Sequence, residues 1–267
     1  MGVQSLIVGI QNPLALEALK LSQQPEHSLS ALTYRKLLAG KSAAGKLTPE
    51  DIEVMSSLPI HFMDIRADQD IVREGDRPSR SCILFEGLAA WWNLTAKGKR
   101  QILSFPIPGD IPDLNSLHLD VLDATLSTLT TCKVGFVQHE VVKTVCAEYP
   151  RIAEFLWRST LIDAAIFRQW VTNVGGRSAY SRIAHLLCET IVRLQAIGLS
   201  DGVTCSFPVT QQELGDATGL SIVHVNRTLK QLREADFLTH KDEKLTILDW
   251  AGLVEAAEFE PAYLHLR

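Results

Sequence analysis

The sequence lacks any apolar run that approaches the roughly 18 residues of a membrane-spanning helix. Its hydrophobic fraction of 46% and charged fraction of 21% over 267 residues are ordinary for a globular protein. No Lys or Arg precedes the apolar stretch in the first ten residues, and Leu6 stands where an acylation signal carries Ser or Thr. Neither a secretory signal nor a myristoyl anchor is expected. We therefore expect a cytoplasmic protein that binds no membrane.

Closely spaced cysteines are also missing. The five cysteines are widely scattered: Cys82, Cys132, Cys146, Cys188 and Cys205. The absence of a CxxC motif and of Cys/His pairs at ligand spacing argues against a disulfide framework or a metal site. We predict buried thiols and no cofactor, with redox sensing by one cysteine as the alternative.

An excess of positive charge is absent as well. The net charge is −5, so the chain has no generally basic surface for nucleic acid. Any binding to DNA must come from a local patch of cationic side chains.

What the sequence does contain changes in character along the chain. Residues 1–30, with one amphipathic stretch from Leu14 to Leu19, are predicted to be a loosely attached extension. A helix is expected from Thr33 to about Leu38. Another begins at Thr48, which can cap a helix that has proline at its first position.

Residues 62–138 alternate short apolar runs with Gly, Pro and Asp turn signals. This density of short strands is typical of a small antiparallel barrel or sandwich. We assign residues 31–148 to this domain.

Residues 149–175 are predicted to form one long helix. Its apolar residues occupy more than one face, so it must be covered on more than one side. One side can lie on the barrel, and the other suits the same helix of a second subunit. The alternative is a buried helix in a monomer. After Gly175 and Gly176, taken as a hinge, a further amphipathic helix is expected from Ser178 to Ile197.

Residues 206–248 carry the most informative pattern. A short strand at 206–209 leads into Thr210-Gln211-Gln212-Glu213, a helix-capping box. Gly219 then suits a tight turn between two helices, the second of which opens at Ser221. A β-hairpin around Lys241-Asp242-Glu243 follows. Together these features predict a winged helix-turn-helix at 176–253, followed by a tail at 254–267.

The second helix of such a unit places its first residues against base edges in the major groove. Arg227 has the fork geometry for guanine, Asn226 can pair with adenine or hold a phosphate, and Ile222 or Val223 can touch a thymine methyl. The predicted DNA-binding residues are Thr210, Gln211, Ser221, Ile222, Val223, Asn226, Arg227, Lys230, Lys241 and Lys244. Five basic and six acidic residues lie between Cys205 and Lys244. A winged helix that binds a protein instead of DNA is therefore the alternative.

The chain from about Leu29 to Leu253 resembles the Crp/Fnr superfamily of bacterial transcription regulators. The resemblance rests on the segment from Gly219 to Leu229, on the run from Arg182 to Glu189, and on the spacing from Gly75-Asp76 to Glu86-Gly87. It implies an α+β fold, with a jelly-roll β-barrel like those that bind cyclic nucleotides, a long dimerisation helix and a C-terminal winged helix-turn-helix. The expected partners are double-stranded DNA, a second copy of the chain and RNA polymerase.

The chain departs from the family at the sensor site. Cyclic-nucleotide-binding members hold the phosphate with an Arg-Ser pair, whereas no Lys or Arg lies between Gln101 and Cys132. A buried phosphate facing Asp113 and Asp123 would lack a cation, so cyclic AMP is not expected. With no cysteine before Cys82, the iron–sulfur centre of the oxygen-sensing members is not expected either. An unidentified small effector would contact the matching barrel residues, which are Gly109, Asp113, Leu114, Leu117, Asp123 and Thr125.

The resemblance also bears on the reading helix. Arg227 matches a guanine-contacting arginine of the family, and Val223 stands where the family has a glutamate that accepts from cytosine.

A third hypothesis is that the protein is an enzyme. His118, Asp113 and Asp123 form no nucleophile–base or metal-ligand arrangement, and no catalytic residue is predicted.

Overall fold

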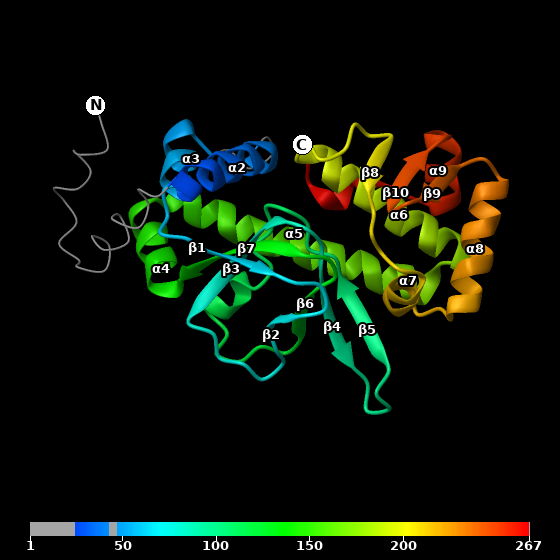
Figure 1. The fold of residues 1–267 in the computed structure, drawn as a ribbon, viewed down its shortest axis with the longest axis horizontal. Helices are drawn as coiled ribbons and strands as arrows, with labels where there is room; N and C mark the ends of the chain where they lie inside the picture. The colour runs from blue at the N-terminus through cyan, green and yellow to red at the C-terminus, as the bar shows by residue number, and fades with distance from the viewer. Residues whose placement is uncertain (1–24, 43–46, 267) are drawn as a thin grey trace.

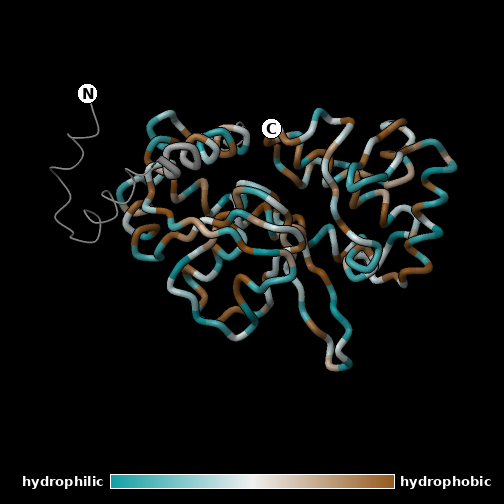
Figure 2. The backbone as a smooth tube through the Cα atoms, in the orientation of Figure 1, coloured by the Kyte–Doolittle hydropathy of each residue, from teal (hydrophilic) through white to brown (hydrophobic). Residues whose placement is uncertain are grey.

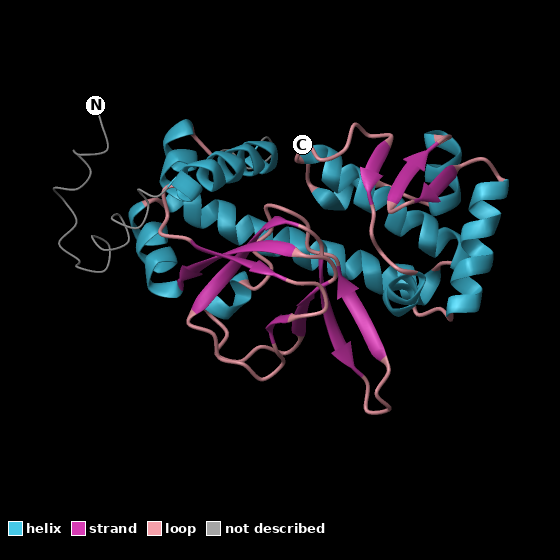
Figure 3. Ribbon diagram, viewed as in Figure 1, coloured by secondary structure: helices cyan, strands magenta, loops and turns pink. Residues whose placement is uncertain are grey.

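A computed structural model describes residues 25–42 and 47–266. They form two domains joined by one long helix, α5 (Pro150–Gly176), which runs behind the barrel into the second domain (Figures 1 and 3). The predicted amphipathic stretch from Leu14 to Leu19 lies outside the described residues. None of the helices within the described ranges is long and apolar enough to cross a membrane.

Two helices precede the barrel, α2 (Pro25–Ser42) and α3 (Pro49–Ser56). The cap predicted at Thr48 is confirmed: the Thr48 amide donates to Asp51 Oδ2 at 2.8 Å, and Thr48 Oγ1 accepts from the Asp51 amide at 3.2 Å. Helix α2 extends beyond the predicted range at both ends, and its residues Tyr34 and Leu38 are buried in the barrel core. That tertiary contact has no signal in the local sequence.

The first domain, called the barrel below, contains two antiparallel sheets, with strand orders β1-β7-β3 and β2-β6-β4-β5. The strand bounds are β1 His61–Ile65, β2 Asp70–Val72, β3 Arg80–Glu86, β4 Ala89–Leu94, β5 Arg100–Ser104, β6 Thr125–Thr128 and β7 Cys132–Gln138. A single 3-10 turn, η3 (Leu114–Leu117), follows β5. Apolar residues recur along the strands and lie inside the domain (Figure 2). The predicted barrel is therefore confirmed.

Helix α5 is anchored in both domains. After α4 (His139–Glu148), its first turns place Ile152 and Leu156 in the barrel core. Its last turns place Ile166 and Trp170 in a core shared with the second domain. One continuous helix therefore fixes the position of the second domain against the barrel.

The second domain begins with α6 (Ala179–Ala196), capped by Ser178. The remaining elements are β8 Thr204–Ser206, α7 Gln211–Thr218, α8 Ile222–Glu234, β9 Leu238–Lys241, β10 Lys244–Ile247, α9 Trp250–Ala257 and the 3-10 turn η4 Pro261–Leu264. Strands β8, β10 and β9 form its sheet.

The boundaries differ from the sequence expectation in three places. Gly175 and Gly176 belong to the last turn of α5, and the chain turns at Arg177 instead. The short strand ends at Ser206 and does not continue to 209. Residues 254–266 are not a loose tail, because α9 crosses the expected boundary and Phe259 and Leu264 are buried in the domain core.

Candidate nucleic-acid interface

Helix α7 begins at the predicted capping box. Glu213 Oε2 accepts hydrogen bonds from the Thr210 amide at 2.7 Å and from Thr210 Oγ1 at 2.8 Å. Thr210 Oγ1 in turn accepts from the Glu213 amide at 3.2 Å. These bonds satisfy backbone donors that a helix N-terminus leaves free, and they fix where α7 starts.

The turn between α7 and α8 depends on two glycines. Gly219 ends α7 with φ of 70°, a left-handed conformation that L side chains rarely adopt. A Cβ on Gly215 would lie 2.7 Å from the Leu220 carbonyl oxygen, so only glycine lets the turn pack this closely. Thr218, where an apolar residue is commoner in such units, is buried and donates to the Leu214 carbonyl at 2.5 Å.

Helix α8 has one buried and one exposed face. Val225, Thr228, Leu229 and Leu232 pack inward. The opposite face of α8 lies at the edge of the molecule, and hydrophilic residues predominate along the helix (Figures 1 and 2). The predicted reading residues on this face are all exposed: Ser221, Ile222, Val223, Asn226, Arg227 and Lys230. Val223 is 80% exposed, so its side chain is accessible to a partner.

Arg227 is free to bind an anion or a base. Among the described residues no carboxylate lies within ion-pair distance of its guanidinium. Its Nη2 lies 2.6 Å from His224 Nε2, one helical turn away. Lys230, by contrast, pairs with Glu234 at 3.5 Å. The structure therefore leaves Arg227 as an unneutralised cation near the start of α8.

Two residues that sequence reasoning missed hold this arrangement. His224 restrains Arg227 through the contact just described. Arg182, on α6, donates from Nη1 to the Thr218 carbonyl at 2.7 Å and from Nη2 to the Arg177 carbonyl at 3.0 Å. It thereby ties the end of α7 to the start of α6. The contact between His224 and Arg227 could have been predicted from their i, i+3 spacing on one helix. The hydrogen bond from Arg182 to Thr218 could not, because it joins residues far apart in the sequence.

The predicted wing is confirmed. Strands β9 and β10 pair in antiparallel register, with Lys241 opposite Lys244, and Asp242 and Glu243 form the turn with positive φ. Both lysines are exposed at the hairpin tip. Thr210 is exposed and Gln211 half-buried at the start of α7. All four predicted contact residues on the wing and at the start of α7 are therefore at least partly accessible.

A hairpin of the barrel contacts the pair of helices α7 and α8, which we call the reading unit. Arg100 Nε, on β5, pairs with Asp216 Oδ2 of α7 at 2.8 Å, and Gln101 Nε2 donates to the Ala217 carbonyl at 3.3 Å. This contact between the barrel and the helix-turn-helix is separate from the α5 connection.

The predicted effector residues differ in burial and in hydrogen-bond partners. Asp113 is fully buried and accepts from the Cys82 amide at 2.8 Å, and burial raises its pKa to about 7. Thr125 Oγ1 accepts from the Glu74 amide at 3.1 Å, and Asp123 is exposed. Leu114 is buried and Leu117 partly buried, both in the core between barrel and helices. Gly109 lines a cavity described below.

A second exposed feature lies on α5. Trp157, Leu161, Ala164, Arg168 and Val171 follow one another at steps of four, three, four and three residues, which places them on one face of the helix. We call them the α5 stripe. Trp157 is 69% exposed, Leu161 56% and Val171 74%. Large apolar side chains in such a row indicate a surface that another molecule covers.

The cysteines and acidic residues show no sign of a metal centre. Four cysteines are buried and Cys146 is half-buried, and all five are free thiols. Across residues 25–42 and 47–266, no group of three His, Cys, Asp or Glu side chains is placed to hold a metal ion.

Comparison with known proteins covers both domains. Residues 62–149 match the cyclic nucleotide-binding domain family, and residues 181–256 match the Crp-like helix-turn-helix domain family. The chain is 22% identical over 220 residues to the transcriptional activator protein FnrA of Stutzerimonas stutzeri, covering 82% of this chain and 90% of that protein. It is 26% identical over 193 residues to the nitrogen fixation regulation protein FixK of Bradyrhizobium diazoefficiens, covering 71% and 78% respectively.

The fold is also that of a solved relative. The structure of FixK2 from Bradyrhizobium japonicum superposes with a TM-score of 0.67 at 21% identity, covering 74% of this chain and 96% of that chain. The predicted fold is therefore confirmed.

Proposed function

Because the chain belongs to the Crp/Fnr family of DNA-binding transcription regulators, we propose that it acts as a homodimer whose two α8 helices read the halves of a symmetric operator. The observation that carries this proposal is the exposed face of α8, where Arg227 has no carboxylate partner among the described residues. A cation left free at the start of an exposed helix suits base edges in a major groove.

Dimerisation would occur through the α5 stripe. Its heptad-like spacing matches the seam of two helices that pack side by side, and its exposed apolar residues would be buried there. A two-fold axis through this seam would present the two reading units to half-sites about 34 Å apart.

The predicted residues then take separate roles. Arg227 would contact guanine O6 and N7, while Asn226 would pair with adenine or hold a phosphate. Ile222 and Val223 would touch thymine methyl groups. Thr210, Gln211, Ser221, Lys230, Lys241 and Lys244 would contact the phosphate backbone or the groove edge. Such a regulator would work in the cytoplasm, with RNA polymerase as its further partner.

Selection of operators from random duplex DNA tests the proposal. We expect a two-fold symmetric sequence with half-sites one helical turn apart, bound with an affinity that falls steeply as salt rises. Recovery of no sequence preference would instead support the alternative, a winged helix that contacts a protein. The nearly even balance of acidic and basic residues in this unit makes that alternative worth testing.

The variant Val223→Glu is expected to change the preferred base at one position of each half-site. A glutamate there can accept from cytosine N4, so the selected base pair should shift toward cytosine by about 1–3 kcal/mol of discrimination. The measurement is the same selection with the variant, and Val223→Ala is the control for simple loss of the side chain. Identical operators for Val223→Glu and the parent protein would remove Val223 from the base-reading residues.

A further inference from the structure

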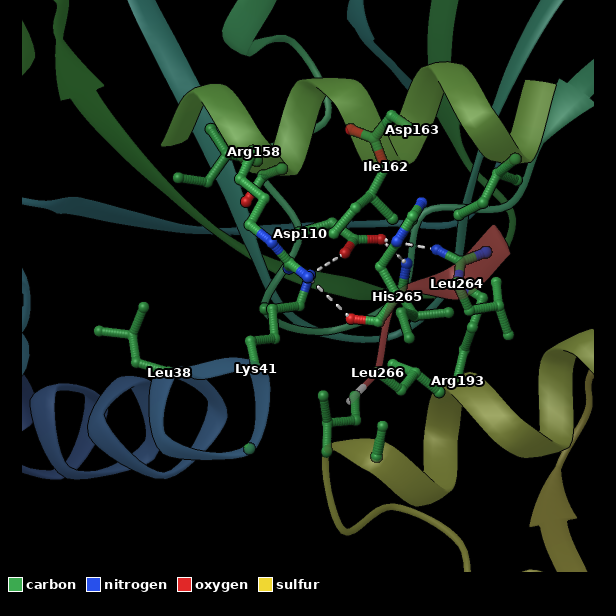
Figure 4. Close-up of a pocket in the computed structure, with 18 of the residues that line it drawn as sticks. Leu38, Lys41, Asp110, Arg158, Ile162, Asp163, Arg193, Leu264, His265 and Leu266 are labelled. Atoms are coloured by element: carbon green, nitrogen blue, oxygen red, sulfur yellow. Dashed lines mark hydrogen bonds and ion pairs between the residues drawn. The ribbon is translucent and has the colours of Figure 1, made fainter. Parts of the chain in front are cut away.

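A cavity of about 360 Å³ lies outside the barrel, at the junction of the two domains. Helix α2, helix α5, helix α6, the loop before η3 and the segment after η4 form its walls (Figure 4). Its apolar lining includes Leu38, Ile107, Phe155, Ile162, Ile166 and Leu264. The volume and the mostly apolar walls are those of a small-molecule site, in which a few polar groups fix the ligand.

One charged group in this cavity is already neutralised. Asp110, in the loop before η3, pairs with Lys41 of α2 and, at 3.1 Å, with Arg193 of α6 (Figure 4). Burial alone would raise the pKa of Asp110, but these two cations outweigh it and hold that pKa below its ordinary value. Arg193 is further engaged by the Phe105 carbonyl at 3.1 Å and by Glu189 at 3.6 Å. Neither cation is therefore free for a ligand.

Asp163 is the charged group that this network leaves out. It lies on α5 and lines the same cavity, yet none of the described side chains or amides forms a hydrogen bond or ion pair with its carboxylate. Burial, and then repulsion from Asp110, raise the pKa of Asp163 to about 6, although the nearby charges of Lys41 and Arg193 lower it in part. Asp163 is half-buried, so water can still reach its carboxylate, and a cation bound in the cavity would replace that water with a charge-assisted hydrogen bond.

The remaining cation in the lining, Arg158, is less available than Asp163. Its Nη2 donates to the His265 carbonyl at 3.1 Å, in a solvent-exposed position. The cavity therefore offers an acceptor without a donor next to apolar walls, whereas its cations all have acceptors.

We propose that this cavity binds a small apolar amine, with its ammonium group on the Asp163 carboxylate and its hydrocarbon part against Ile162, Ile166 and Phe155. An ammonium supplies both the hydrogen-bond donors and the positive charge that Asp163 lacks. The apolar part gains by leaving water for walls that are already formed. The site differs from the barrel interior in which a cyclic nucleotide-binding domain would be expected to hold an effector.

A ligand there would touch both domains. Ile107 belongs to the barrel, Arg193 to the second domain and Asp163 to the helix between them. Occupancy would therefore bias how the reading unit sits against the barrel. This consequence rests on the proposed function, but binding itself can be measured on free protein without DNA, so the two can fail separately.

The test is titration calorimetry of the full chain with three probes of similar size, phenethylamine, 2-phenylethanol and 3-phenylpropionate. We expect phenethylamine to bind at millimolar concentration or below, the alcohol about tenfold more weakly, and the propionate more weakly still. Equal binding of amine and alcohol, tighter binding of the propionate, or no binding of phenethylamine would overturn the proposal.

The variant Asp163→Asn should lower phenethylamine affinity by about tenfold to a hundredfold while leaving the alcohol unchanged, because it removes a charge-assisted hydrogen bond and keeps the shape. Asp64→Asn, at an exposed position of strand β1 that belongs to none of the proposed sites, is the matched control and should have no effect. Thermal unfolding checks that both variants are folded, and unchanged amine affinity in folded Asp163→Asn would contradict the assignment.

The pH dependence gives a second readout that does not depend on a variant. The charged and titratable groups around Asp163 are Lys41 on α2, Asp110 in the loop, Arg193 on α6, Arg158 on α5 and His265 after η4. With a pKa of about 6, Asp163 is neutral below that pH and ionised above it. Phenethylamine affinity should therefore rise about tenfold from pH 5 to pH 7 in the parent and stay flat in Asp163→Asn. A fall in affinity over this range would contradict the proposal.

Discussion

Replacing Leu161 with glutamate is expected to yield a monomer in solution and to lower affinity for a symmetric operator by about 10²- to 10⁴-fold. Leu161 belongs to the α5 stripe, so two stripes that pack side by side in parallel bring its two copies together. Glutamate would place two carboxylates in an apolar seam, where both desolvation and mutual repulsion oppose association. Each reading unit would then bind its half-site alone, and the gain from tethering two units would be lost.

Sedimentation equilibrium and operator titration measure these two effects. The matched control is Leu248→Glu, because Leu248 is also 56% exposed but lies outside the stripe. It should remain dimeric and bind the operator normally. A Leu161→Glu protein that stays dimeric would show that the subunits meet elsewhere.

Removal of the Arg227 guanidinium is expected to abolish most operator preference. A bidentate contact to guanine contributes about 1–3 kcal/mol, and a dimer makes it twice, so Arg227→Ala should weaken specific binding by roughly thirty-fold to more than ten-thousand-fold. Binding to unrelated DNA should fall much less, because phosphate contacts from lysines supply most of it. Competition titrations with operator and random duplexes measure the ratio.

Two further variants distinguish base recognition by Arg227 from a general effect of positive charge on α8. Arg233→Ala removes an exposed arginine from the last turn of the same helix, far from its N-terminal end, and should change the ratio little. Arg227→Lys keeps the positive charge but loses the two-pronged guanidinium. Compared with Arg227→Ala, it should therefore recover affinity for random DNA more fully than preference for the operator. Equal losses on operator and random DNA in Arg227→Ala would reduce Arg227 to a phosphate contact.

Features set by neighbouring residues were predictable from the sequence. The capping boxes at Thr48 and Thr210, the left-handed turn at Gly219 and the hairpin at Lys241–Lys244 each depend on a few consecutive residues. Their backbone donors and allowed dihedral angles determine the local structure whatever packs around them. The outward direction of Arg227 followed from the spacing of the apolar residues in α8.

Features set by distant contacts were not predictable. The segment after residue 253 carries few helix signals, yet it is ordered because Phe259 and Leu264 pack in a common core and Tyr263 donates to Glu189 at 2.6 Å. The pairing of Lys41, Asp110 and Arg193 joins three parts of the chain that no local pattern connects.

The effector residues named from the resemblance stay a prediction, and the cavity at the domain junction illustrates the same limit. The family resemblance predicted effector contacts at a set of barrel residues. One of these, Asp113, accepts a hydrogen bond from the Cys82 backbone amide in the structure. Only Gly109 of that set borders the junction cavity, because the cavity exists through the docking of α2 and of the C-terminal segment on α5 and α6. Neither docking contact could be read from the sequence of the barrel.

The geometry of α5 also sets how many ligands a dimer could hold. Phe155, Ser159, Ile162 and Ile166 of the cavity wall are offset by two residues from Trp157, Leu161, Ala164 and Arg168, which amounts to about 200° around the helix axis. The cavities would therefore sit on opposite flanks of the paired helices, about two helix diameters or 20 Å apart. Saturation would require two equivalents per dimer, and any cooperativity between them would have to be transmitted through the helix pair.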